Sequence, residues 1–272
     1  AHWTVNKYYL DLKGNCDGSN ASGINGYGTA NVDINGVNDV AGVTDYYKQQ
    51  PYGTQYAINK IAATTGHTYN GVASGSLTAT ITGTTSVSLK FTTNKYKVTL
   101  DNQGATTAGT AAYWYKYKKT TSVNGETIYY YTDEAMTSSP MSGSKITVPT
   151  KTGYTFGGYY TATNGGGTMY VNASGVCQNS IYSNVAGNTT LYAKWTANKY
   201  KVTLNNQGAT IAGTTAYWYK YKTTTTVSGE TIYYYTDEAM TASPMKGSKI
   251  TIPTKTGYTF GGYYTATNGG GT

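Results

Sequence analysis

The chain has 272 residues, of which only 37 are Leu, Ile, Val or Phe, whereas 31 are Tyr and 4 are Trp. So few aliphatic side chains exclude one deep aliphatic core, and with it a single large enzyme domain; aromatic rings can instead close several small cores while their polar tips stay in water. All 20 basic residues are Lys, against 12 acidic residues, which gives a net charge of +8. The absence of Arg argues against nucleic acid as a partner, because recognition of phosphates and bases relies on the bidentate guanidinium.

The N-terminal segment Ala1–Tyr8 has the same pattern as two later segments, Leu89–Tyr96 and Ala193–Tyr200. Each of these later segments ends one sequence unit and begins the next. We therefore expect residues 1–5 to be the tail of a preceding repeat and the chain to be an internal piece of a longer protein. No apolar run approaches the roughly 20 residues of a membrane-spanning helix, so no membrane span is predicted in this piece.

Residues 6–93 are interpreted as a diverged first repeat module, because their turn signals fall in the same order as those of the second module. We match Asn35-Gly36 with Asn124-Gly125, Thr44-Asp45 with Thr132-Asp133, and the series 53–58 then 65–71 with the series 143–148 then 152–158.

Residues 94–197 form the second module, in which apolar and polar side chains alternate with a period of two, as in half-buried strands. The first predicted strand spans 96–100. A hairpin follows, in which Tyr113–Lys118 and Thr127–Tyr131 are joined by a turn at Asn124-Gly125, a pair that favours the positive φ angles of a two-residue turn.

Beyond the hairpin, Thr132–Met136 is predicted to form one short helical turn, the strongest helix signal in the module. Further strands are predicted at Lys145–Val148, at Gly153–Tyr160 and, closing the module, at Leu191–Trp195. The expected fold class is therefore mainly β, a tandem array of small β-sheet modules with little helix.

Residues 198–272 form the third module, which nearly duplicates the second. Asn94–Thr168 recurs as Asn198–Thr272 at an offset of 104 residues, and none of the nine substitutions replaces an aromatic residue or a glycine. Such faithful copying is typical of structural modules in quasi-linear arrays. The third module has no counterpart of Met169–Ala197 and is thus truncated before its closing strand.

The series Gly153–Tyr160, a Gly-rich turn, Leu191–Trp195 and then Tyr200–Leu204 resembles the Listeria-Bacteroides repeat, the B-repeat type of internalin-like bacterial surface proteins. The first module is also similar to mucin-binding-type repeats. The chain departs from the pattern at Tyr159, where that family usually has Trp, and in the long Tyr-rich hairpin. The resemblance implies a small β-grasp-like α+β module of an extracellular, cell-wall-linked protein, with a stalk or adhesin role and no catalysis.

Residues that carry catalysis or bind metals are sparse, so we expect no catalytic residue, metal or cofactor. His67 aligns with Tyr154 and Tyr258 of the other modules, which indicates a packing residue. The acidic pairs Asp133-Glu134 and Asp237-Glu238 are interpreted as turn or helix caps with a solvated neighbour.

Cys16 and Cys177 lie in different modules and are interpreted as two free thiols. A disulfide between them remains an alternative that requires their Cα atoms to approach within about 7 Å. An isopeptide crosslink between a Lys and an Asn side chain is a second alternative, since each repeat contains Lys, Asn and an acid, Glu126 or Glu230. The spacing of these residues does not indicate which Lys and Asn would react.

The aromatic clusters of the two hairpins are the strongest candidates for binding. Their rings alternate on paired strands, and only one face of a hairpin can pack on its own core. The other face would be a Lys-studded aromatic platform for sugars or a partner protein. The alternative is that the rings form cross-strand ladders that stiffen the hairpin. The candidates are Tyr113, Trp114, Tyr115, Tyr117, Tyr129, Tyr131, Tyr217, Trp218, Tyr219, Tyr221, Tyr233 and Tyr235.

These features predict a non-catalytic structural region of a secreted bacterial surface protein, whose neighbouring repeats are its first partners and stack into a stalk or adhesive shaft. One alternative is a module that binds glycans, cell-wall polymers or host proteins through the tyrosine hairpins. Another is self-association into a filament, in which the strand missing from the third module is supplied by the Ala1–Trp3 region of another chain.

Overall fold

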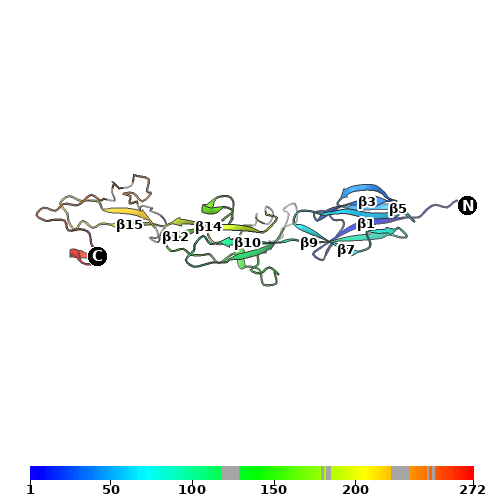
Figure 1. The fold of residues 1–272 in the computed structure, drawn as a ribbon, viewed down its shortest axis with the longest axis horizontal. Helices are drawn as coiled ribbons and strands as arrows, with labels where there is room; N and C mark the ends of the chain where they lie inside the picture. Colours follow the sequence, from blue (N-terminus) through cyan, green and yellow to red (C-terminus); the bar gives the residue numbers. More distant parts are fainter. Residues whose placement is uncertain (118–128, 179–180, 182–184, 222–232, 244, 247–248) are drawn as a thin grey trace.

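The computed structural model describes residues 1–117, 129–178, 181, 185–221, 233–243, 245–246 and 249–272. It shows small β-sheet units that follow one another along an elongated molecule, with the two termini toward opposite ends (Figure 1). The short helical elements η1 (Ser142–Ser144), η2 (Thr163–Gly165) and η4 (Thr267–Gly269) are 3-10 turns of three residues each. The mainly β, multi-sheet fold predicted from the sequence is confirmed.

The first unit contains two sheets that share one core. Every second residue of one strand reaches this core: Leu10, Leu12, Gly14 and Cys16 are buried, whereas the residues that alternate with them are only partly buried. One sheet has the order β2-β1-β9-β7 with β5 also paired to β1, and the other has the order β4-β3-β6-β8. The strands are β1 (Lys7–Cys16), β2 (Ser19–Ala21), β3 (Gly28–Ile34), β4 (Val37–Val43), β5 (Tyr46–Pro51), β6 (Gln55–Ala63), β7 (His67–Ser74), β8 (Thr78–Thr80) and β9 (Thr85–Thr93).

The second unit is built on one five-stranded sheet with the order β11-β10-β14-β12-β13. Its core is largely aromatic, because Tyr113, Tyr115, Tyr130 and Tyr159 are its largest fully buried side chains. Tyrosine therefore supplies the apolar area that the scarce aliphatic residues cannot. The strands are β10 (Lys95–Asp101), β11 (Ala112–Lys116), β12 (Tyr154–Tyr160), β13 (Met169–Val171) and β14 (Thr189–Ala197).

The first two units share a four-stranded kernel. In each, the first strand (β1 or β10) lies between an antiparallel strand (β5 or β11) and a parallel one (β9 or β14), which pairs in turn with an antiparallel strand (β7 or β12). The predicted match of 65–71 with 152–158 agrees with this kernel. The match of Asn35-Gly36 with Asn124-Gly125 is wrong, because Asn35-Gly36 joins β3 to β4 in the extra sheet, ahead of β5. Asn124-Gly125 lies outside the described residues.

The third unit retains only part of this kernel. Strands β15 (Lys199–Thr203) and β16 (Ala216–Lys220) pair in the same register as β10 and β11. Residues 258–264 form no strand, because the chain has no counterpart of β14 with which they could pair. Phe260 is consequently 39% exposed, whereas its counterpart Phe156 is 9% exposed.

Two local predictions were wrong. Thr132–Met136 forms a turn and no helix: Met136 has a positive φ of 57°, and the Asp133 carboxylate accepts the backbone N–H of Thr137, which holds the chain in a side-chain-capped turn. Lys145–Val148 forms no regular strand. Lys145 forms an isolated bridge with Val176. The next residues make single backbone hydrogen bonds to two different loops, from the Ile146 N–H to the carbonyl of Gly175 and from the Thr110 N–H to the carbonyl of Thr147, so no continuous ladder forms.

Candidate functional site

The inner face of the second-unit hairpin is closed to ligands. Alternation along β11 turns Tyr113 and Tyr115 away from solvent, and Tyr117, the residue after the strand, continues the pattern; all three are buried. The Tyr113 ring meets Tyr130 of the returning segment edge to face, at 5.4 Å and 89°, and burial raises the pKa values of Tyr113 and Tyr115. The prediction that Tyr113, Tyr115 and Tyr117 bind a ligand was therefore wrong, because these rings form the core and the packing between units.

The outer face of the same hairpin carries the remaining aromatic candidates. Trp114 and Tyr131 exchange both backbone hydrogen bonds, at 2.8 and 2.9 Å, so the predicted pairing of the two segments is confirmed at this position. The Lys97 Nζ lies 5.3 Å from the centroid of the Trp114 ring, within the range of a cation–π contact. Tyr129 is exposed. We call Lys97, Trp114, Tyr129 and Tyr131 the outer platform.

The third unit repeats the outer platform. Trp218 and Tyr235 exchange backbone hydrogen bonds of 2.9 Å, Lys201 Nζ lies 5.1 Å from the Trp218 ring, and Tyr233 is exposed. On the inner face, the candidates Tyr217, Tyr219 and Tyr221 keep the positions of their second-unit counterparts. They are only partly buried, because the third unit lacks the segment that covers this core in the second.

The first two units meet at a tight joint, whose contacting residues were not among the site residues predicted from the sequence. Asn94 is the single residue between β9 and β10. Its backbone N–H donates to the carbonyl of Gly66 at 2.8 Å, and its carbonyl accepts the N–H of Tyr117 at 2.9 Å. Its side-chain oxygen also accepts the Thr68 hydroxyl, at 2.7 Å. One residue is thereby hydrogen-bonded to both units at once.

Aromatic rings close this joint. Gly66 has a φ of +83°, and the Tyr117 ring covers it so closely that a Cβ atom there would overlap the ring carbons. The Tyr117 ring meets His67 at 6.5 Å and 87° and Tyr96 at 6.1 Å and 90°, both edge to face. His67 is therefore a packing residue, as predicted, and its burial lowers its pKa.

The joint between the second and third units is the same. Asn198 donates its N–H to the carbonyl of Gly153 and accepts the N–H of Tyr221, both at 2.8 Å. Its side-chain oxygen accepts the Thr155 hydroxyl at 2.7 Å. The Tyr221 ring lies against Gly153, where a Cβ would again overlap it, and meets Tyr154 edge to face at 5.8 Å. The sequence signal for both joints was the Thr-Gly-aromatic turn combined with the Asn of each junction.

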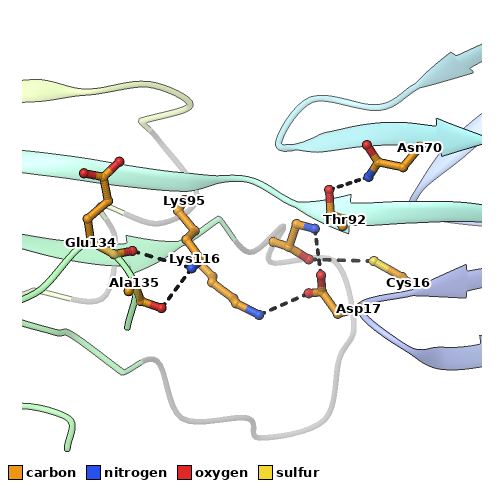
Figure 2. A network of polar contacts seen from close by, with 9 residues as sticks. Cys16, Asp17, Asn70, Thr92, Lys95, Lys116, Glu134 and Ala135 are labelled. Atoms are coloured by element: carbon orange, nitrogen blue, oxygen red, sulfur yellow. Dashed lines mark hydrogen bonds and ion pairs between the residues drawn. The ribbon is translucent and has the colours of Figure 1, made fainter. Parts of the chain in front are cut away.

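Polar contacts surround the first joint (Figure 2). Lys116 of the second unit pairs with Asp17 of the first at 3.3 Å, and Asp17 also accepts the backbone N–H of Thr93 at 3.2 Å. Lys95 donates to the carbonyl of Ala135 at 3.0 Å, which ties the start of β10 to the turn after the hairpin. The contacts between units at this joint are thus both apolar and ionic.

The two cysteines are free and lie in separate cores. Burial raises the pKa of Cys16 and raises that of Cys177 to about 12, so both thiols stay protonated and poorly reactive at neutral pH. The alternative of a disulfide between them does not apply to this structure. The proposed crosslink acids Glu126 and Glu230 lie outside the described residues.

Within the described part of the chain, no group of three or more His, Cys, Asp or Glu side chains is placed to hold a metal ion. No helix in that part is long and apolar enough to cross a membrane. No known protein-family model matches the chain. The outer platforms and the two joints are therefore the features on which a function can be argued.

Proposed function

We propose that this chain is a non-catalytic structural region whose units stack into a stiff stalk. The repeated joint is the observation that carries the proposal. Two junctions that join different pairs of units, around Asn94 and Asn198, use the same hydrogen bonds and the same glycine–tyrosine contact. A contact that recurs in this way is expected when each unit must hold its neighbour in one orientation.

The stiffness follows from the length and bonding of the linkers. Flexible linkers need several unbonded residues, whereas here a single residue, Asn94, separates β9 from β10 and is hydrogen-bonded to Gly66, Thr68 and Tyr117. Bending at the joint would break these bonds, each worth about 1 kcal/mol, and would expose the buried ring of Tyr117. Neighbouring repeats are thus the first partners of every unit.

We further propose that the stalk belongs to a secreted, cell-wall-linked protein of a bacterium and holds another domain away from the cell, in a spacer or adhesive role. The resemblance of Gly153–Tyr160 and Leu191–Trp195 to the repeats of such surface proteins supports this placement. The many Lys side chains and scarce aliphatic residues suit thin units that expose much of their surface to water.

The experiment is a distance measurement between units. Spin labels attached to Val37→Cys and Met169→Cys, two exposed positions in the first and second units, should give one narrow distance distribution by pulsed electron resonance. The native thiols are buried and should not be labelled. A broad distribution, like that of flexibly tethered domains, would contradict the stalk.

A second candidate function rests on the outer platform. Lys97 and Trp114 in the second unit, and Lys201 and Trp218 in the third, present the same cation–aromatic pair on the exposed face. Indole faces stack on sugars and anchor protein contacts, so glycans, cell-wall polymers or a host protein are the proposed ligands. Titration with oligosaccharides, followed by tryptophan fluorescence, should give a response that Trp114→Ala combined with Trp218→Ala removes; no response from the native chain would exclude glycans.

A further inference from the structure

Two tyrosine rings are stacked on the outer face of a sheet in the first unit. Strands β1 and β5 pair antiparallel, with Tyr9 opposite Gln49 and Asp11 opposite Tyr47. Tyr9 and Tyr47 are therefore diagonal neighbours across the two strands, at a spacing that aromatic side chains can bridge. Their ring centroids lie 4.3 Å apart, and the ring planes are within 9° of parallel. We call Tyr9 and Tyr47 the stacked pair.

The stacked pair is open to solvent. The strand neighbours Leu10 and Tyr46 are buried in the core of the first unit. Because successive side chains of a strand point to opposite faces, Tyr9 and Tyr47 point away from that core. Tyr47 is 59% exposed and Tyr9 is partly exposed. Small solutes and enzymes can thus reach these two phenol rings without any part of the unit unfolding.

Parallel contact between two phenol rings is the arrangement that favours their oxidative coupling. A phenol that loses one electron and one proton becomes a phenoxyl radical. Its unpaired electron lies partly on the ring carbons next to the C–O carbon, in orbitals perpendicular to the ring plane. Two such radicals form a carbon–carbon bond when these orbitals face each other, as they do between stacked rings. Rings that are steeply tilted direct the same orbitals away from each other.

We propose that Tyr9 and Tyr47 are a site of oxidative modification, at which a peroxidase acting with hydrogen peroxide joins the two rings as dityrosine. Each phenol gives up one electron and one proton, and together these reduce one peroxide molecule to two water molecules. A bond forms between one ortho carbon of each ring. The hydrogen atom on each of these carbons then moves through solvent to the phenol oxygen, which restores both aromatic rings. The product lacks two hydrogen atoms of the original pair.

The crosslink would join β5 to β1 covalently. Tyr9 and Tyr47 are separated by 38 positions in the chain, so the new bond would close a long loop. Closing such a loop restricts the unfolded chain, as a disulfide does. The free thiols Cys16 and Cys177 lie in separate cores and form no such bond. The inference goes beyond the proposed stalk and needs only the stacked pair.

A second tyrosine pair in the same unit provides a matched comparison. Tyr8 of β1 and Tyr52, the residue after β5, have ring centroids 6.5 Å apart and ring planes tilted by 60°. Tyr52 is 58% exposed, almost the same as Tyr47, and Tyr8 is partly exposed, like Tyr9. If exposure alone selected the reacting rings, both pairs would couple equally. The geometry favours Tyr9 and Tyr47.

The test is oxidation of the dilute full chain by a peroxidase with limiting hydrogen peroxide. The monomer fraction is isolated, digested and examined by mass spectrometry and by the fluorescence of dityrosine. The monomer should lose the mass of two hydrogen atoms, and the peptide with Tyr9 should be joined to the peptide with Tyr47. Tyr47→Phe keeps a ring on the stack but removes the phenol, so it should abolish this product. Tyr52→Phe, an equally mild change, should leave its yield unchanged.

Three outcomes would overturn the inference. One is a crosslink between Tyr8 and Tyr52 that forms as often as the crosslink between Tyr9 and Tyr47. Another is dityrosine found exclusively between molecules, with none in the monomer. The third is an equal yield of the Tyr9–Tyr47 product when the chain is oxidised after unfolding in urea. None of these measurements depends on the distance between units, so the stalk and this modification stand or fall separately.

Discussion

The ring of Tyr117 lies over Gly66 so closely that a Cβ atom on Gly66 would overlap it. These two residues belong to different units and are separated by 51 positions in the chain. Their contact recurs between Tyr221 and Gly153, so both joints depend on the absence of a side chain at the glycine of the turn.

Gly66→Ala should loosen the first joint. The added methyl group would displace the Tyr117 ring, a cost of about 1–3 kcal/mol for overpacking, in addition to the roughly 1–2 kcal/mol of a non-glycine residue at positive φ. Gly18→Ala is the matched control, because Gly18 has a similar φ of +88° with nothing within 4 Å of its Cβ position. Denaturant unfolding should show a larger loss for Gly66→Ala; equal losses would refute the close contact.

Tyr117→Ala should uncouple the first two units. The substitution removes a buried ring and should lower the free energy of unfolding by about 3 kcal/mol, while the Val37–Met169 spin-label distance distribution broadens. Tyr117→Phe should preserve both quantities, because the ring contacts with His67 and Tyr96 do not need the hydroxyl. A narrow distribution in Tyr117→Ala would mean that the backbone bonds of Asn94 hold the joint alone.

Asp17→Asn should have a small effect. The ion pair between Asp17 and Lys116 spans 3.3 Å, but both side chains are partly exposed, and such pairs contribute about 0–1 kcal/mol. The asparagine side-chain oxygen can still accept the N–H of Thr93. Unfolding in low and high salt should differ little between the variant and the native chain, and a loss above about 2 kcal/mol would show that charge holds the joint.

Alkaline pH should destabilise the second unit. Burial raises the pKa of Cys177 from its ordinary value of 9.0 to about 12, so the unfolded chain loses this proton at lower pH than the folded chain. The thiol's contribution to stability is fully present below pH 9 and is lost as pH rises toward 12, by about 1.4 kcal/mol per pH unit. The raised pKa values of Tyr113, Tyr115 and Tyr159 act in the same direction.

Denaturant midpoints measured between pH 8 and pH 10.5 test this dependence. Cys177→Ala should give a shallower decline between pH 9 and pH 10, where the tyrosines of the unfolded chain contribute less. A midpoint that stays constant over this interval in the native chain would contradict the burial of these groups.

In the tyrosine hairpin, the sequence predicted how the rings divide between two faces but not which face is buried. The period-2 pattern groups Tyr113, Tyr115 and Tyr117 on one face and leaves Trp114 on the other, but it does not say which face is inside. That choice depends on segments far along the chain: the hydroxyl of Tyr115, for example, donates to the carbonyl of Val185 at 2.8 Å. The candidate set therefore mixed core rings with exposed ones.

The sequence by itself determined the β class, the duplicated hairpins and the strands at 96–100, 153–160 and 191–195, because side-chain alternation, turn residues and exact repetition are local properties of the chain. Only the tertiary structure decided which aromatic face is buried and which residues of one unit contact the next. The joint brings Gly66, Asn94 and Tyr117 together from three separate segments, and such a contact is specified by the packing of folded units, which a residue pattern along one strand does not contain.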